Sequence, residues 1–338
     1  MAESTANFPP HRPRIGLALG AGAARGWAHI GVLDGLISAG IRPDVVAGCS
    51  IGALVGGAYV NGRLEALRDW VTGLSRWDVV RYFELNWSSS GWVNCDKLRA
   101  DLVRHVVDED QAIEGLPIRF ATVATNLATG QEVWVDRGGV LEAIWASIAL
   151  PGLFPPVPDA AHWLVDGGLV NPVPVSVCRM LRADVVVAVN LNRGVLGARR
   201  GSPWTPPDLP DEVTTEEHEK PEPAGEGPMA FLGEVSSVLR DRAALLWPGG
   251  RSAGGAVAPG TLDILATSLD IMQDRIVRSR MAGEPPDLLL APRLWDIGIL
   301  EFHRASEAIE VGRRAVDEAL PRILDELDRW GIPLERPA

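Results

Sequence analysis

The sequence has few cysteines, fewer basic than acidic residues, and no long hydrophobic run. Its 338 residues include three cysteines, Cys49, Cys95 and Cys178, whose odd number and wide spacing give neither a disulfide framework nor a metal-binding motif. Lys and Arg number 32 against 44 Asp and Glu, so the net charge is −12. This charge argues against nucleic acid as a partner and against strong general attraction to anionic lipid.

Segments that direct a protein to or across a membrane are also missing. Residues 1–13 are polar and contain proline, without the apolar stretch of a signal peptide. No run approaches the roughly 18–20 apolar residues that span a bilayer. We therefore expect a cytoplasmic protein, with at most peripheral contact to a membrane, and we expect residues 1–13 to be disordered.

Hydrophobic residues make up 46% of the chain, enough for a sizeable core. Short apolar runs alternate with helical patterns, which predicts an α/β fold. We expect a single domain formed by residues 14–193 and completed by 261–332. Residues 194–260, rich in proline and acidic side chains, are predicted to be a variable and partly disordered insert.

The chain is organised around its first strand–helix–strand unit. Ile15–Leu19 reads as a buried strand, residues 20–26 as a glycine-rich loop, Trp27–Ala39 as a helix and Asp44–Ala47 as a second strand. Two parallel strands joined by one helix form a right-handed unit, so the loop after the first strand and the turn after the second lie at the same edge of the sheet. Ligands bind at that edge in open α/β sheets.

The turn after the second strand carries a serine between glycines. The sequence Gly48-Cys49-Ser50-Ile51-Gly52 at a strand-to-helix junction is typical of a nucleophile elbow, which lifts the serine hydroxyl clear of the sheet. The alternative is a closely packed turn in which Ser50 merely caps the following helix.

The glycine-rich loop offers backbone N–H groups to a negatively charged atom. It consists of Gly20, Ala21, Gly22, Ala23, Ala24, Arg25 and Gly26. Acyl transfer passes through a tetrahedral oxyanion, and a preformed N–H donor stabilises that species by about 3–4 kcal/mol. The rival interpretation is a phosphate cradle, but the Lys-Ser or Lys-Thr that closes such a loop is missing and the glycine spacing does not fit a dinucleotide site.

A candidate acidic residue comes later in the chain. Residues 118–125 and 131–136 predict a hairpin, 141–148 a helix, and His162–Val165 a strand that leads into Asp166-Gly167-Gly168. A carboxylate at such a strand end can reach a neighbouring strand end, although a plain Asp-Gly turn would have the same sequence. The aromatic stretch Arg76–Val93 is expected to be irregular.

With these three motifs in this order, the chain resembles the patatin-like phospholipase family, in particular bacterial single-domain members related to the catalytic part of neuropathy target esterase. The resemblance runs from about Arg14 to Asn192, with a weaker echo from Pro286 to Ala319. It implies a doubly wound, mostly parallel α/β sheet between layers of helices. It also implies a Ser–Asp dyad with Ser50 as nucleophile and Asp166 as general base, and Gly22, Ala23 and their neighbours as the oxyanion hole. Arg25 would match a basic residue of the family's loop.

The resemblance implies a serine acyl hydrolase that cleaves carboxyl esters of phospholipids or lysophospholipids without a metal or cofactor. An unperturbed Asp has a pKa near 3.9 and is a poor base at pH 7, so Asp166 must gain basicity from burial or act mainly by orienting Ser50.

Other interpretations of the same residues stay open. A general carboxylesterase or thioesterase with a Ser-His-Asp triad could use Ser50, Asp166 and His303, which follow in the usual order. His29 lies inside the first predicted helix and is better explained by packing. A lipid-binding protein that kept the fold without catalysis is a further alternative. The acyl position, the chain length and the oligomeric state are left open by the sequence.

Overall fold

The computed structural model describes residues 12–82, 95–160, 162–194 and 261–334. The chain divides into two compact units, one formed by Met1–Leu196 with Asp270–Ala338 and one by Gly197–Leu269. Apart from the beginning of one helix, the features below belong to the first unit. The expected insert at 194–260 and nearly all of the expected disordered segment at 1–13 lie outside the described residues, so the division into domains stays a prediction.

The first strand–helix–strand unit forms as its sequence predicts. Strand β1 covers Ile15–Leu19, helix α1 Ala28–Ser38 and strand β2 Val45–Cys49. The two strands pair in parallel with Leu19 opposite Gly48. The glycine-rich loop and the serine turn therefore leave the sheet side by side, as predicted.

The described residues form one eight-stranded mixed sheet, in the order β5-β6-β3-β2-β1-β7-β8, with β4 also paired to β3. Strands β1, β2, β3, β7 and β8 run parallel, whereas β4, β5 and β6 form antiparallel pairs. The remaining strands are β3 Arg119–Asn126, β4 Glu132–Val135, β5 Val157–Asp159, β6 His162–Asp166, β7 Val185–Val189 and β8 Leu288–Leu290.

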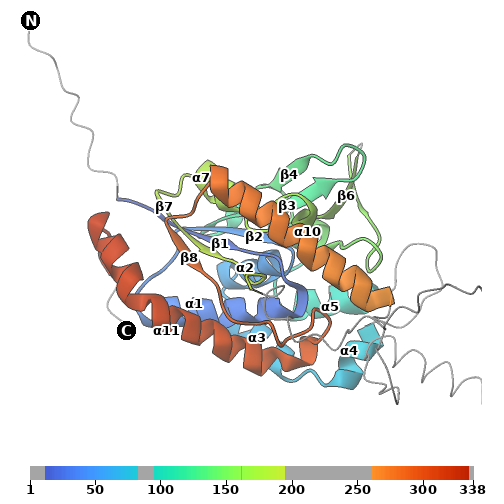
Figure 1. The fold of residues 1–338 in the computed structure, drawn as a ribbon. Coiled ribbons are helices and arrows are strands. Elements are labelled where there is room, and N and C mark those ends of the chain that lie inside the picture. The colour runs from blue at the N-terminus through green and yellow to red at the C-terminus, as the bar shows by residue number, and fades with distance from the viewer. Residues whose placement is uncertain (1–11, 83–94, 161, 195–260, 335–338) are drawn as a thin grey trace, which may run out of the picture. The chain divides into compact units, whose positions relative to one another are not determined.

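Helices cover both faces of the sheet (Figure 1). Besides α1, they are α2 Ile51–Val60, α3 Leu64–Thr72, α4 Arg76–Tyr82, α5 Cys95–His105, α6 Val140–Ile148, α7 Val175–Met180, α10 Thr261–Gly283 and α11 Ala305–Arg329. Short 3-10 turns occupy Ala23–Trp27 and Gly167–Leu169. This arrangement confirms the doubly wound α/β fold.

The two faces of the sheet differ in the size of their side chains. Leu17 and Leu19 point to the face covered by α1, α2, α6 and α11, whereas Ala18 points to the face covered by α7 and the Val277 region of α10. The alternation follows from the period of two in a strand. Both faces are buried, which is why the central strands are almost wholly apolar.

One part of the sequence prediction was wrong. Residues 76–82 form helix α4 rather than irregular chain. The backbone N–H and hydroxyl of Ser75 donate to the Asp78 carboxylate, and the N–H of Asp78 donates to the Ser75 hydroxyl. This reciprocal cap satisfies free N–H groups of the first turn. The Ser-x-x-Asp signal was present but was masked by the aromatic residues, and the rest of that stretch, 83–93, lies outside the described residues.

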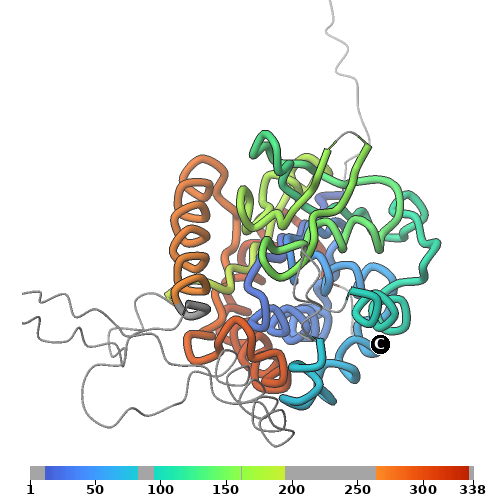
Figure 2. Tube along the Cα trace, turned by 90° about the vertical axis from the view of Figure 1, so that its right-hand side faces the viewer, coloured from blue at the N-terminus to red at the C-terminus, as the bar shows by residue number. Residues whose placement is uncertain are grey.

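Helices α1 and α11 pack against each other through glycine, and they lie side by side in both views (Figures 1 and 2). A Cβ atom on Gly31 would lie 1.8 Å from the carbonyl oxygen of Ile309, and one on Gly312 would lie 2.0 Å from that of Ala28. The two backbones therefore approach so closely that neither position has room for a methyl group.

We expect Gly312→Ala to lower the free energy of unfolding by at least about 2 kcal/mol, because overpacking forces the two helices apart. Urea unfolding followed by circular dichroism measures this. Gly283→Ala is the matched control, since a Cβ there meets nothing within 4 Å. It should leave stability unchanged or raise it by up to about 1 kcal/mol. Equal effects of the two substitutions would contradict the packing argument.

Candidate active site

Ser50 is the single residue that connects the end of β2 to the start of α2. Its backbone has φ 55° and ψ −123°, a conformation that is strained for any residue other than glycine. The backbone N–H of Ser50 donates to Ser147 Oγ at 2.8 Å, and Ser147 Oγ donates to the Val123 carbonyl at 2.6 Å. The buried Ser147 thus links the turn to strand β3 and supports its strained geometry.

One glycine of the motif and one of the glycine-rich loop allow this turn to sit close to its neighbours. A Cβ on Gly52 would lie 2.1 Å from the carbonyl oxygen of Leu19, and one on Gly26 would lie 2.1 Å from the Ile51 side chain. The serine turn therefore rests directly against the end of β1 and the glycine-rich loop. This contact agrees with the nucleophile-elbow pattern and explains why its flanking residues are small.

Strand register brings Asp166 to Ser50. Cys49 lies opposite Val123 in the parallel pair of β2 with β3, and the next residue of β3, Ala124, lies opposite Asp166 in the antiparallel pair with β6. Asp166 is thus level with Ser50, with only strand β3 between their strands. Ser50 Oγ donates to Asp166 Oδ2 at 2.5 Å. The structure brings together the two residues that sequence analysis selected.

The Asp166 carboxylate is held in place on its other side as well. The N–H of Gly168 donates to Oδ1 at 2.6 Å, and a Cβ on Gly167 would lie 2.3 Å from the Val123 carbonyl oxygen. The main chain of Asp166 bonds to Ala149 and to the Thr125 hydroxyl. The Asp-Gly-Gly sequence therefore forms a tight turn that aims the carboxylate at Ser50.

Burial changes the acidity of this carboxyl group. Asp166 is 2% exposed, and loss of hydration raises its pKa to about 6, even though the hydrogen bonds from Ser50 and Gly168 favour the charged form and act in the opposite direction. An aspartate with this pKa is ionised at pH 7 yet is a much better proton acceptor than a solvated one. Burial thus supplies the basicity that an ordinary aspartate lacks.

The N–H groups of the glycine-rich loop are not equally available. Those of Gly20, Ala21, Ala24 and Arg25 donate to backbone carbonyls of Val189, Pro172, Ile299 and Gly22, respectively. Among the described residues, no acceptor receives the N–H of Gly22 or Ala23. Gly26 lies inside the 3-10 turn Ala23–Trp27. Of the seven residues expected to line an oxyanion hole, Gly22 and Ala23 are therefore the ones with an N–H group available.

Ala23 adopts a backbone conformation that favours glycine, with φ 49°. It lines the same pocket as Ser50 and Ile51. The N–H of Ile51, the first residue of α2, also meets no acceptor within the described part of the chain. Sequence analysis did not single out this donor, although the residue after the serine supplies one in nucleophile elbows generally.

Arg25 of the loop and His29 of α1 are buried inside the protein and do not line the pocket. His29 is fully buried, its Nε2 lies 2.8 Å from the Gly20 carbonyl oxygen, and burial lowers its pKa to about 4, so it is neutral at pH 7. Arg25 is also fully buried and pairs with Asp270, Nη1 to Oδ1 at 2.8 Å. The guanidinium of Arg25 therefore does not reach the pocket.

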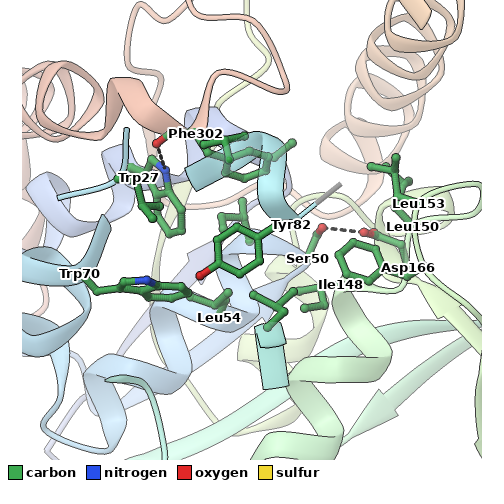
Figure 3. Close-up of a pocket in the computed structure, with 16 residues that line it drawn as sticks. Trp27, Ser50, Leu54, Trp70, Tyr82, Ile148, Leu150, Leu153, Asp166 and Phe302 are labelled. Carbon is green, nitrogen blue, oxygen red and sulfur yellow. Dashed lines mark hydrogen bonds between the residues drawn. The ribbon is translucent and has the colours of Figure 1, made fainter. Parts of the chain in front are cut away.

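An apolar pocket opens at Ser50 (Figure 3). Figure 3 shows Ser50 and Asp166 toward one side of it and Trp27 and Trp70 toward the other, with Leu54 and Tyr82 between. The ring of His105 stacks on the indole of Trp70, with the ring centroids 5.3 Å apart. The remaining lining residues are Ala23, Ile51, Leu74, Val79, Leu98, Ile148, Leu150, Leu153, Phe154 and Phe302. Such a lining suits a hydrocarbon chain.

Comparison of the sequence with known proteins places the chain in a family. The family model described as patatin-like phospholipase matches residues 17–179. An NTE family protein of Mycobacterium tuberculosis is 34% identical over 342 residues, covering 91% of this chain and 91% of that protein. The chain belongs to the patatin-like phospholipase family.

Two eukaryotic relatives of this patatin-like protein are named for their activities. A neuropathy target esterase of Drosophila melanogaster is 32% identical over 52% of this chain and 13% of its own length. A protein of Emericella nidulans named lysophospholipase is 31% identical over 52% of this chain and 12% of its own length. Membership in the family makes the protein a lipid hydrolase and confirms the resemblance drawn from the sequence.

The histidine of the alternative triad lies elsewhere in this patatin-like enzyme. His303 Nε2 accepts a hydrogen bond from Arg76 Nε at 3.2 Å, and His303 is not among the residues that line the pocket. The two carboxylate oxygens of Asp166 accept from Ser50 and from Gly168 instead.

No described helix is both long and apolar enough to cross a membrane.

We expect Ser147→Ala to weaken the site, because it leaves the partly buried N–H of Ser50 without its acceptor. Its free energy of unfolding should fall by about 1–3 kcal/mol, and ester turnover per folded molecule by about tenfold or more as the turn relaxes.

Thr122→Val is the control for Ser147→Ala, because it removes another buried hydroxyl, one bonded to the Ala143 carbonyl. It should affect stability alone. Turnover and urea unfolding are measured on the same preparations. Wild-type turnover by a folded Ser147→Ala variant would contradict the positioning role of Ser147.

Proposed function

We propose that the protein is a serine acyl hydrolase that cleaves carboxyl esters of lipids, phospholipid or lysophospholipid, through an acyl-enzyme on Ser50. The observation that carries the proposal is the 2.5 Å hydrogen bond from Ser50 Oγ to a buried Asp166 carboxylate, both of which line an apolar pocket. The relative named lysophospholipase supports this substrate class.

In the first half of the reaction, Ser50 Oγ attacks the ester carbonyl carbon and its proton passes to Asp166 Oδ2. The carbonyl oxygen becomes an oxyanion, which the N–H groups of Gly22, Ala23 and Ile51 stabilise. The tetrahedral species then collapses as the bond to the alcohol oxygen breaks. Asp166 returns its proton to that oxygen, the alcohol leaves, and the acyl group stays on Ser50.

In the second half, a water molecule takes the place of the alcohol. Asp166 accepts a proton from the water, whose oxygen attacks the acyl carbon through a second oxyanion. The bond to Ser50 Oγ then breaks, the proton returns to Oγ, and the fatty acid is released. The apolar pocket holds the acyl chain throughout, so the enzyme must draw its substrate from a lipid surface or a micelle, which implies peripheral contact.

Covalent labelling with a fluorophosphonate tests this proposal. We expect one adduct on Ser50, none in Ser50→Ala, and labelling slowed by about a hundredfold or more in Asp166→Asn, because the attacking hydroxyl loses its base. His303→Ala should label at the wild-type rate. Peptide mass spectrometry locates the adduct. Labelling that depends on His303 would favour the triad, and a folded wild type that stays unlabelled even with lipid vesicles would favour a binding protein.

The pH profile follows from the raised pKa of Asp166. Below about pH 6 the carboxyl group is protonated and cannot accept the Ser50 proton, so kcat/KM should fall tenfold per pH unit on the acid side and level off above it. Hydrolysis of a short-chain ester across pH 4.5–8, with circular dichroism at each pH, measures this. The residual activity of Asp166→Asn should lack this acid limb. A wild-type rate that stays constant down to pH 4.5 would exclude Asp166 as the base.

A further inference from the structure

Arg25 is the largest fully buried side chain of the described chain, yet it lies next to the two loop residues with unpaired N–H groups. All three nitrogens of its guanidinium donate hydrogen bonds. Nε donates to the Ile297 carbonyl at 3.0 Å, and Nη1 donates to Asn192 Oδ1 at 3.0 Å. The remaining charge is met by Asp270 of helix α10, which accepts from Nη1 at 2.8 Å and from Nη2 at 3.1 Å. The fork-to-fork geometry fixes both the distance and the plane of the two groups.

The network continues along α10 to the other half of the site. Gln273, one turn beyond Asp270, accepts from Asn192 Nδ2 at 2.7 Å. Its own amide nitrogen lies only 2.6 Å from where a Cβ of Gly168 would stand, so it packs on the turn that holds Asp166. One face of α10 therefore contacts both the glycine-rich loop, through Arg25, and the Asp-Gly-Gly turn, through Gln273.

We propose that Asp270 is a positioning residue for the oxyanion-binding loop: through Arg25 it fixes the orientation of the Gly22 and Ala23 N–H groups toward Ser50. This inference rests on the function proposed above. Asp270 bonds to Arg25 and is not among the residues that line the pocket, so we expect its effect on the reaction to be indirect.

The physical reason is the intrinsic freedom of the loop. Three of the seven residues from 20 to 26 are glycine, and Ala23 is in a left-handed conformation that its own side chain disfavours. Such a segment keeps one conformation only when its surroundings impose it. A buried bidentate ion pair does this more rigidly than apolar packing, because departures from its geometry are costly where the dielectric constant is low.

Asp270→Asn is the central variant, because it keeps the size and one acceptor oxygen of the side chain but removes its charge. Asp274→Asn is its matched control on the same helix, since Asp274 pairs with the exposed Arg278. Asp270→Glu restores the charge. Each full-length variant is characterised by fluorophosphonate titration of active sites, by kcat and KM for a short-chain ester, and by affinity for a trifluoromethyl ketone, which forms a tetrahedral oxyanion on serine.

We expect Asp270→Asn to lower kcat per titrated site by about tenfold to a hundredfold with KM nearly unchanged, since oxyanion donors act on the transition state. Affinity for the ketone should fall in parallel. Asp274→Asn should match wild type, and Asp270→Glu should recover much of the loss. A purely structural role would lower the fraction of titrated sites but leave kcat per site and ketone affinity intact, which would overturn the proposal.

A second variant covers the case in which Asp270→Asn does not fold. Arg25→Met with Asp270→Leu replaces the ion pair by apolar side chains of similar volume, a change that buried ion pairs often tolerate. A folded double variant with reduced kcat per site supports the proposal, and wild-type kcat per site overturns it. Wild-type protein that neither labels nor hydrolyses esters would instead refute the proposed function, which separates the two failures.

Discussion

The site depends on keeping a carboxylate charged and aimed while it is excluded from water. Asp166 is buried, and this burial raises its pKa, whereas the hydrogen bonds from Ser50 and Gly168 lower it. No cationic side chain is among these causes. Burial alone would raise the pKa further, and full hydration would leave the group too weak a base. The observed balance places its pKa between these limits.

A consequence is that the architecture around Asp166 must be rigid. Antiparallel β6 is paired with β3, so that Asp166 lies opposite Ala124 and level with Ser50. Ser147 connects strand β3 to Ser50 as well. Its hydroxyl donates to the Val123 carbonyl and accepts from the Ser50 N–H. Strand β3 is therefore the common support of the two residues in the proposed dyad.

The ion pair near the site is buried inside the protein, whereas the pocket lining is mostly apolar. Arg25 and Asp270 neutralise each other inside the protein, so the buried guanidinium of the loop is committed to structure. The pocket itself is lined by apolar and aromatic side chains, apart from Ser50, Asp166 and the Tyr82 hydroxyl, which bonds to Asp101. Among the described residues, this pocket thus offers an acyl chain many contacts and a charged headgroup few. That division is consistent with a lipid hydrolase whose recognition is dominated by the hydrocarbon part of its substrate.

Local sequence patterns determined the strands β1 and β2, the serine turn, the glycine-rich loop and the Asp-Gly-Gly turn, because glycine spacing and apolar runs encode tight turns and buried strands within a few residues. The Ser75–Asp78 cap that begins α4 was equally local and was overlooked. Only the tertiary structure decided which loop N–H groups are bonded and which stay free. The acceptors of the bonded groups include Val189, Pro172 and Ile299, which lie far along the chain. The partners Ser147, Asn192, Asp270 and Gln273 also came from distant elements. Single polar residues on helices and strand ends carry no pattern that identifies such contacts; packing creates them, because a buried polar group must find its partner wherever the fold brings one.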